Sequence, residues 1–127
     1  MNWEISYWPD DEIVYVKTQG TMTLALLTQM SEDALAEAAK RASVRILVDN
    51  RAMTHAITVI DIYHLPEQLR VLGLSPAHAV ANVFSVDTEQ KADFKFFDDR
   101  AYNSGLRHAL FTDVEAAREW LMAQRSR

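Results

Sequence analysis

Stretches of strand length alternate with helical periodicities along this chain, and no other feature limits the available folds as strongly. Alternating apolar residues predict strands at residues 3–8 and 13–17, joined by a turn at residues 9–11, with Gly20 as the end of the second strand. Apolar runs predict three more strands at residues 44–48, 78–86 and 106–111. Because helical patterns separate these runs, we expect a sheet that is largely parallel beyond the first hairpin.

Capping residues and apolar stripes define the intervening helices. Thr23 is expected to cap a helix that reaches about Arg41, and Asp113 to cap the last helix. Asp87 or Thr88 is expected to cap a helix that carries phenylalanines on one face. The predicted order is ββαβαβαβα, a single α/β domain spanning residues 1–127 with a mixed five-stranded sheet and helices packed on it.

Pro66 interrupts a helical period that starts near Thr58. Proline lacks the N–H group of the helical hydrogen bond and crowds the preceding turn. We therefore predict two helical pieces, residues 58–64 and 66–72, with Gly73 as the stop.

Composition excludes several classes of function. The net charge of −5 disfavours nucleic acid and anionic lipid as partners. The absence of cysteine removes disulfides, thiolate metal sites and thiol nucleophiles. The acidic start MNWEISYWPDDE does not resemble a signal peptide, and no apolar run approaches the ~20 residues of a transmembrane helix. We therefore expect a cytoplasmic protein without a transmembrane segment.

Glycine is scarce, and each glycine stands at the boundary of a predicted element. Loops that cradle phosphates need several glycines, so that backbone amides can approach the anion. No serine has the glycine-flanked pattern of a nucleophile elbow. We therefore expect no cofactor.

Three stretches carry a resemblance to a known family. They are RILVDNRAM with VIDIYHLPEQLRVLGL, then AVANVFSVDTEQKADFKFFDDRAYNSG, and finally LFTDVEAAREWL. With the element order, they make the chain similar to the STAS-like (SpoIIAA-like) family, in particular its small stand-alone bacterial members. The resemblance implies a small mixed sheet covered by helices, and a protein that binds partners. Several members of the family are controlled by phosphorylation of a hydroxyl at the start of the helix after the third strand.

Thr58 falls near the position of that hydroxyl. The phospho-regulated members have an Asp-Ser-Ser-Gly motif, whereas here Ala56 and Ile57 precede Thr58 and no glycine follows. Thr58 and Thr54 are therefore candidate switch hydroxyls, with a helix cap and a loop turn as their alternative roles.

The end of the third strand carries candidate contact residues. Asp49 is expected at the carboxyl end of a parallel strand, where ligands of open α/β sheets bind. Arg51, His55 and Thr58 could converge with it there. The alternative is that Asp49 pairs with Arg51 or accepts bonds from loop amides.

The remaining histidines offer weaker patterns. Asp61 and His64 are three residues apart on a helix and could form an acid–base pair or part of a metal site. His78 and His108 open two strands that could be neighbours. A metal needs three or four ligands and no motif has ligand spacing, so we expect no metal site. Residues 98–100 are expected to form a solvated helix face.

Residues 57–72 are apolar on more than one face, which exceeds what a single helix face can bury in a sheet. The excess could be covered by a second subunit, by a partner protein or by a lipid-like ligand. The leading hypothesis is a non-enzymatic interaction or regulatory module, a homodimer whose contact surface at residues 54–72 includes Ile60, Tyr63 and His64.

Two further hypotheses come from other classes. The first is a carrier of a small apolar molecule, with the same segment as a lid and Asp49, Arg51 or His55 at a polar head group. The second is an acid–base enzyme that uses His55 or His64 with Asp49 or Asp61. The enzyme is the least supported, because no nucleophile or oxyanion site is recognisable.

Overall fold

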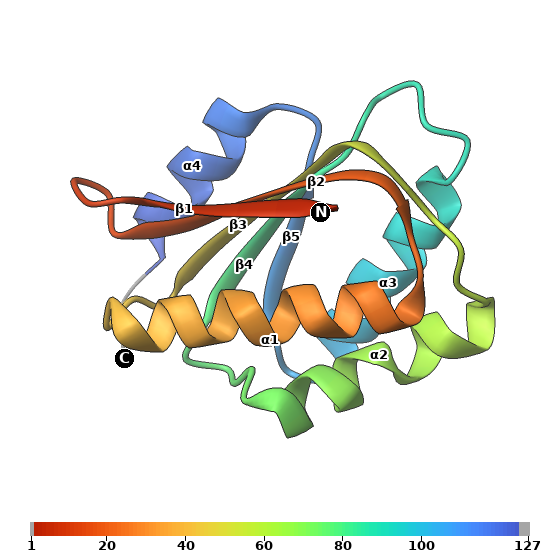
Figure 1. Cartoon of the computed structure of the whole chain (residues 1–127), viewed down its shortest axis with the longest axis horizontal. Helices are drawn as coiled ribbons and strands as arrows, with labels where there is room; N and C mark the ends of the chain where they lie inside the picture. The colour runs from red at the N-terminus through yellow and green to blue at the C-terminus, as the bar shows by residue number, and fades with distance from the viewer. Residues whose placement is uncertain (1, 125–127) are drawn as a thin grey trace.

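The computed structural model describes residues 2–124 and contains a five-stranded sheet in the order β1-β2-β3-β4-β5 (Figure 1). The strands are β1 (Trp3–Trp8), β2 (Ile13–Met22), β3 (Arg45–His55), β4 (Ala79–Val83) and β5 (Arg107–Phe111). The helices are α1 (Leu24–Lys40), α2 (Val59–Leu72), α3 (Lys91–Asn103) and α4 (Val114–Ala123). The predicted element order and mixed sheet are confirmed. β1 and β2 are antiparallel, and all later neighbours are parallel.

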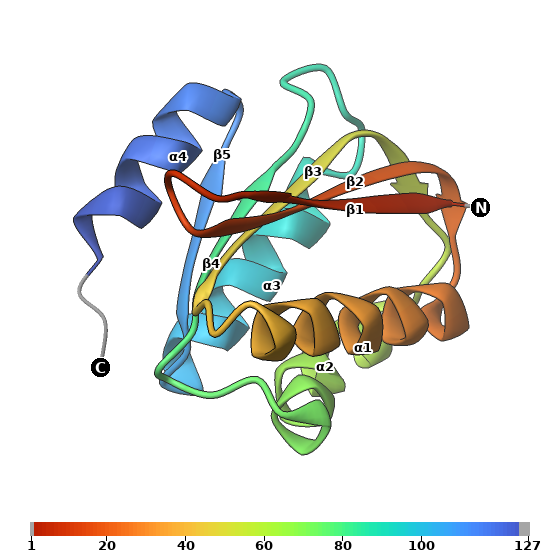
Figure 2. The ribbon, with the colours of Figure 1, turned by 60° about the vertical axis from the view of Figure 1, so that its left-hand side comes forward.

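The two faces of the sheet are covered unequally. Because β2 to β5 advance in one direction across the sheet, right-handed crossovers place the connecting helices on one face. α1, α2 and α3 lie on that face, and α4, which follows the last strand, covers the other (Figure 2). Alternate residues of β3 serve the two layers, with Ile46 and Val48 in the α1 core and Leu47 in the α4 core.

β2 and β3 are longer than the sequence predicted. Gly20 has a φ of 71° but does not end β2, because pairing with β3 continues through Met22. β3 runs on past Asp49 to His55, so Asp49 is mid-strand rather than at a strand tip. The register between the two strands shifts between Lys17 and Gln19, which changes the alternation of side chains along the second half of β3.

α2 is one continuous helix, so the prediction of two pieces separated at Pro66 is wrong. Proline removes a single helical hydrogen bond, and here its ring is buried, so packing offsets that loss. Thr58 also fixes the first turn, because its hydroxyl accepts from the N–H of Asp61 while the Asp61 carboxylate accepts from the N–H of Thr58.

The predicted caps at Thr23 and Asp113 are confirmed by side-chain hydrogen bonds to Leu26 N and Ala116 N. The helix with its phenylalanine face is confirmed as α3, but the predicted cap at Asp87 or Thr88 is wrong. This helix starts at Lys91 after Gln90, and Gln90 makes no side-chain cap. Its amide group is committed elsewhere, to the backbone of β3.

Candidate functional site

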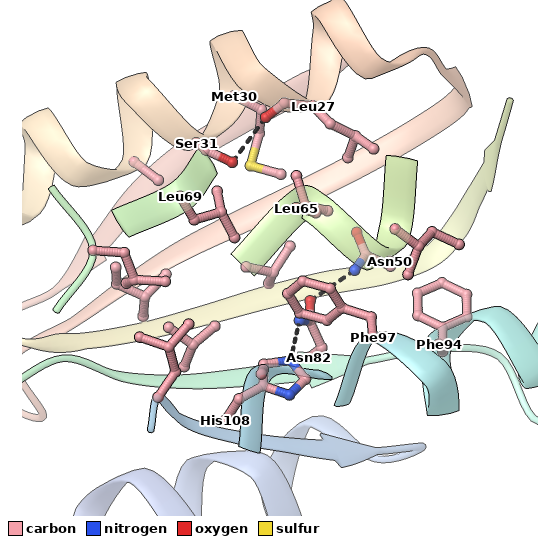
Figure 3. Close-up of a pocket in the computed structure, with 18 of the residues that line it drawn as sticks. Leu27, Met30, Ser31, Asn50, Leu65, Leu69, Asn82, Phe94, Phe97 and His108 are labelled. Atoms are coloured by element: carbon pink, nitrogen blue, oxygen red, sulfur yellow. Dashed lines mark hydrogen bonds between the residues drawn. The ribbon is translucent and has the colours of Figure 1, made fainter. Parts of the chain in front are cut away.

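A cavity of about 140 Å³ lies between the sheet and helices α1, α2 and α3 (Figure 3). Its walls are mostly apolar and include Leu27, Met30, Leu65, Leu69, Phe94 and Phe97. Engineered apolar cavities of about 150 Å³ stay dry and hold a molecule of benzene size. Pockets for drug-sized ligands are larger, about 300 Å³ or more. The space therefore suits one small apolar molecule.

The cavity exists because α2 forms its roof. α2 packs mainly against α1 and α3, and lies farther from the sheet than either of them (Figures 1 and 2). Two arginines tie it to α3. Arg100 Nε donates to Tyr63 O at 3.2 Å, and Arg70 Nη1 donates to Ser104 O. The roof is thus held at its sides, with the space beneath it left unfilled.

A chain of hydrogen bonds runs across the floor of the cavity. Thr18 Oγ1 donates to Asn50 Oδ1 at 2.6 Å, and Asn50 Nδ2 donates to Asn82 Oδ1 at 2.8 Å. Asn82 Nδ2 lies 2.6 Å from His108 Nε2, and His108 Nδ1 lies 2.8 Å from Asp98 Oδ1. The chain crosses four neighbouring strands and ends on α3; its part from Asn50 to His108 is visible in Figure 3.

The direction of this chain fixes the tautomer of His108, whose side chain is only 3% exposed. An amide N–H can only donate, so Asn82 donates to Nε2, and Nδ1 carries the proton that goes to Asp98. Both ring nitrogens are therefore occupied. His108 joins the sheet to α3 and has no lone pair free to take a proton from a ligand.

His55 is the last residue of β3 and lines the cavity, and the backbone pairing at this strand end is unusual. β4 stops at Val83, so the last residue of β3 has a neighbouring strand only on the β2 side, and the Gln90 side chain pairs with its backbone on the other side. Gln90 Oε1 accepts from His55 N and Gln90 Nε2 donates to His55 O, both at 2.9 Å. The ring of His55 lies beside Asp93, in the first turn of α3, and both residues line the cavity.

Asp49 and Arg51 lie on the opposite face of the sheet, so the predicted convergence with His55 and Thr58 is wrong. The Asp49 carboxylate accepts from Tyr15 Oη at 2.6 Å and from Arg51 Nε and Nη2 at 2.9 and 2.8 Å. Burial raises the pKa of Asp49, but these bonds lower it more, so the net direction is downward. Burial and the Asp49 carboxylate raise the pKa of Tyr15 to about 12. The predicted Asp49–Arg51 pair is confirmed, and the side-chain alternation of β3 keeps it away from the cavity.

The two candidate switch hydroxyls have structural roles. Thr58 is the N-cap of α2. Thr54 lies in β3 rather than in a loop, and its Oγ1 is 3.4 Å from Thr21 Oγ1. The proposed Asp61–His64 pair is not formed, because Asp61 completes the cap and the His64 ring meets the edge of Tyr63.

The outer face of α2 is apolar and exposed, as the sequence predicted. Ile60 is 69% and Val71 80% exposed, and Val59 is also exposed. Tyr63 is half-exposed, with the Arg100 guanidinium 4.0 Å from its ring centroid. Residues 98–100 were predicted to be a solvated face, which is wrong for Asp98 and Arg100, because both hold other elements in place.

His78 and His108 stand at neighbouring strands but have separate partners. His78 Nδ1 accepts from Ser75 N at 3.1 Å, and burial lowers the pKa of His78. Within residues 2–124, no three histidine or acidic side chains gather as a metal ion would need. No helix in that range is long and apolar enough to cross a bilayer.

Sequence reasoning missed the two asparagines of the cavity floor and the acids of α3. Asn50 and Asn82 both interrupt apolar strands, and a polar residue in a buried strand needs a partner. Asp98 follows Phe94 by four residues and precedes Ala101 by three, so helical spacing places it on the buried face. These two signals could have located the chain of hydrogen bonds.

Comparison with known proteins supports the fold. The sequence matches no protein-family model and no curated protein. One similar solved structure is an uncharacterized protein from the DUF3478 family with a SpoIIAA-like fold, from Shewanella loihica PV-4. It is 21% identical, with a TM-score of 0.56, and the match covers 94% of this chain and 91% of that chain. This chain therefore has the SpoIIAA-like fold that its sequence motifs implied.

Proposed function

We propose that the protein binds one small apolar molecule in the cavity beneath α2 and acts in the cytoplasm by binding rather than by catalysis. The observation that carries this proposal is the apolar space of about 140 Å³ under a helix that packs mainly on other helices. Filling such a space with a ligand restores the dispersion contacts that its walls lack. The carrier of a small apolar molecule thus ranks above the interaction module, which the sequence alone had favoured.

The histidines of the cavity favour binding over acid–base chemistry. His108 uses both ring nitrogens within the protein. His55 Nδ1 accepts from the N–H of Ile57 at 3.3 Å, so its remaining nitrogen carries the proton. His78, which also lines the cavity, accepts from the N–H of Ser75 with its Nδ1. A general base needs a free lone pair within reach of the substrate, and none of the three rings offers one in this arrangement.

Titration with toluene, followed by methyl NMR, tests the proposal. Toluene matches the cavity in size, and we expect saturable shifts of the Leu65, Leu69 and Met30 methyl groups. The control is Ser31→Leu, since Ser31 lines the cavity from α1 and leucine adds volume there. We expect Ser31→Leu to abolish the shifts and to raise stability by about 0.5–2 kcal/mol, as cavity filling commonly does. Equal shifts in both proteins, or none in the wild type, would contradict the proposal.

The exposed face of α2 supports a second candidate function, an interaction surface for another copy or a partner protein. Val59, Ile60 and Val71 present apolar side chains to solvent without any cover in the single chain. If this surface forms a homodimer, Ile60→Glu should convert it to a monomer in light scattering, while Glu67→Gln on the same helix should not. A wild-type monomer at high concentration would remove the dimer part of this candidate.

A further inference from the structure

We propose that the bound molecule carries a hydroxyl group, which His55 and Asp93 recognise together at one end of the cavity. The inference rests on the proposed binding function and names the chemical class of the ligand. Among the residues that the structure describes, His55 Nε2 is the buried side-chain nitrogen or oxygen atom without a hydrogen-bond partner.

The environment of His55 defines what this atom offers. The side chain is 7% exposed and lines the cavity, and Nδ1 accepts from the N–H of Ile57. The proton therefore sits on Nε2, which is a donor. Asp93 Oδ2 is 2.9 Å away, within ion-pair distance, but the two atoms do not form a hydrogen bond. A buried donor left in this state costs free energy that a suitably placed acceptor would recover.

The pair of groups selects a hydroxyl among the common polar functions. A hydroxyl accepts with its oxygen and donates with its hydrogen, so it can take the N–H of His55 and give its own proton to Asp93. A ketone could accept from His55, but would turn a lone pair toward the Asp93 carboxylate. A ligand carboxylate would bring a second negative charge beside Asp93. An ammonium group could donate to Asp93, but could not accept from His55.

The walls next to this pair suit a ring of about six carbons. Phe94 stacks on Phe84 with ring centroids 5.2 Å apart, and the His55 ring meets Phe94 edge-on at 6.4 Å. Phe97 also lines the cavity. The volume of about 140 Å³ is close to that of cavities known to hold benzene. The inferred class is therefore a phenol or a short alcohol with a compact apolar body.

Parallel titrations of toluene and phenol test the inference, because the two differ by one polar group at similar size. The quantity to compare is the ratio of the two dissociation constants, measured in each variant. His55→Asn keeps an acceptor for the N–H of Ile57 but removes the donor at Nε2. We expect the preference for phenol to fall about tenfold in His55→Asn and in Asp93→Ala, since one good hydrogen bond is worth about that factor. His55→Gln, whose amide can donate near the same place, should restore part of it.

The control is His64→Asn, because His64 is an exposed histidine outside the cavity wall, and it should leave the ratio unchanged. A second readout is the ¹⁵N shift of His55 Nε2, which should move with phenol and hardly with toluene. It requires no variant, so a His55 variant that fails to fold does not prevent the test.

The possible outcomes separate this inference from the proposed function. If toluene and phenol bind with a ratio that His55→Asn and Asp93→Ala leave unchanged, the inference is wrong and the cavity still binds ligands. Tighter binding of benzoate than of phenol would also overturn the hydroxyl assignment. If neither toluene nor phenol shifts the cavity methyl groups, the proposed function itself fails.

Discussion

The two faces of this sheet solve the same packing problem in different ways. On the α4 face, one short helix packs directly on β3, β4 and β5, and the core includes fully buried leucines at 47 and 121. On the other face, α1 and α3 flank the sheet while α2 bridges them, and a cavity remains beneath. The face with three helices is therefore packed less tightly than the α4 face, because α2 rests on α1 and α3 rather than on the sheet.

The buried polar groups of the two faces also differ, because they are fully hydrogen-bonded on the α4 face but not on the cavity face. On the α4 face, the buried Asp49 carboxylate is saturated by Tyr15 and Arg51. On the cavity face, the asparagine chain is complete, but His55 Nε2 lacks a hydrogen-bond partner. Saturated groups stabilise the fold, whereas an unsatisfied buried donor is available to a ligand. We therefore expect a truncation on the α4 face to cost more stability than one beside the cavity, and we propose the cavity face as the one that binds a ligand.

Truncating one leucine on each face should give the largest difference. Leu47→Ala removes a side chain that is 0% exposed in the α4 core, and should lower the free energy of unfolding by about 3–4 kcal/mol. Leu65→Ala removes a half-buried side chain that already borders the cavity, so we expect a loss of about 1–2 kcal/mol. Urea denaturation of both variants measures the two values. Equal losses would mean that the roof is packed as tightly as the α4 face.

Asp49→Asn should have the next largest effect, a loss of about 2 kcal/mol at neutral pH, because charge-assisted bonds to Arg51 and Tyr15 are weakened. Burial raises the pKa of Asp49, but the bonds from Arg51 and Tyr15 lower it below its ordinary value of 3.8. The ionised carboxylate therefore contributes its full stability above about pH 3.8, and loses it as the pH falls through the lower folded-state pKa.

The free energy of unfolding of wild type and Asp49→Asn should thus converge in urea titrations carried out below pH 3.8. Asp113→Asn is a suitable control, because Asp113 caps α4 from an exposed position. A difference between wild type and Asp49→Asn that stays constant down to pH 3 would show that the carboxylate charge is not what stabilises this face.

Local sequence signals predicted the elements of both faces well. The side chains of the caps Thr23, Thr58 and Asp113 each accept from the amide three residues later, so a short window of sequence contains all the information. The excess of apolar residues in α2 was likewise visible, because helical periodicity needs no knowledge of other elements.

Which side chains line each face of the sheet was harder to predict, because this depends on contacts between segments that are distant in the sequence. The length of β3 follows from its pairing with β2, and the register shift between the two strands has no local signature. His55 enters the cavity wall because Gln90, 35 residues later, binds its backbone. The cavity itself is a space between the sheet and three helices, and no single segment encodes it.

The smallest effect should come from the arginines that hold the outer helices. Arg100→Ala removes the guanidinium over the Tyr63 ring and the bond to Tyr63 O, and should lower the free energy of unfolding by about 0.5–1 kcal/mol. Because α2 packs mainly on α1 and α3, the change should speed amide hydrogen exchange in α2 well before it affects the strands. Arg118→Ala is the matched control, since Arg118 binds Asp11 and holds α4 on the other face. If Arg118→Ala loosened α2 as much as Arg100→Ala does, the two faces would open together and α2 would not be a separately movable roof. Faster exchange in α2 alone, accompanied by faster release of toluene, would instead show that this helix controls entry to the cavity.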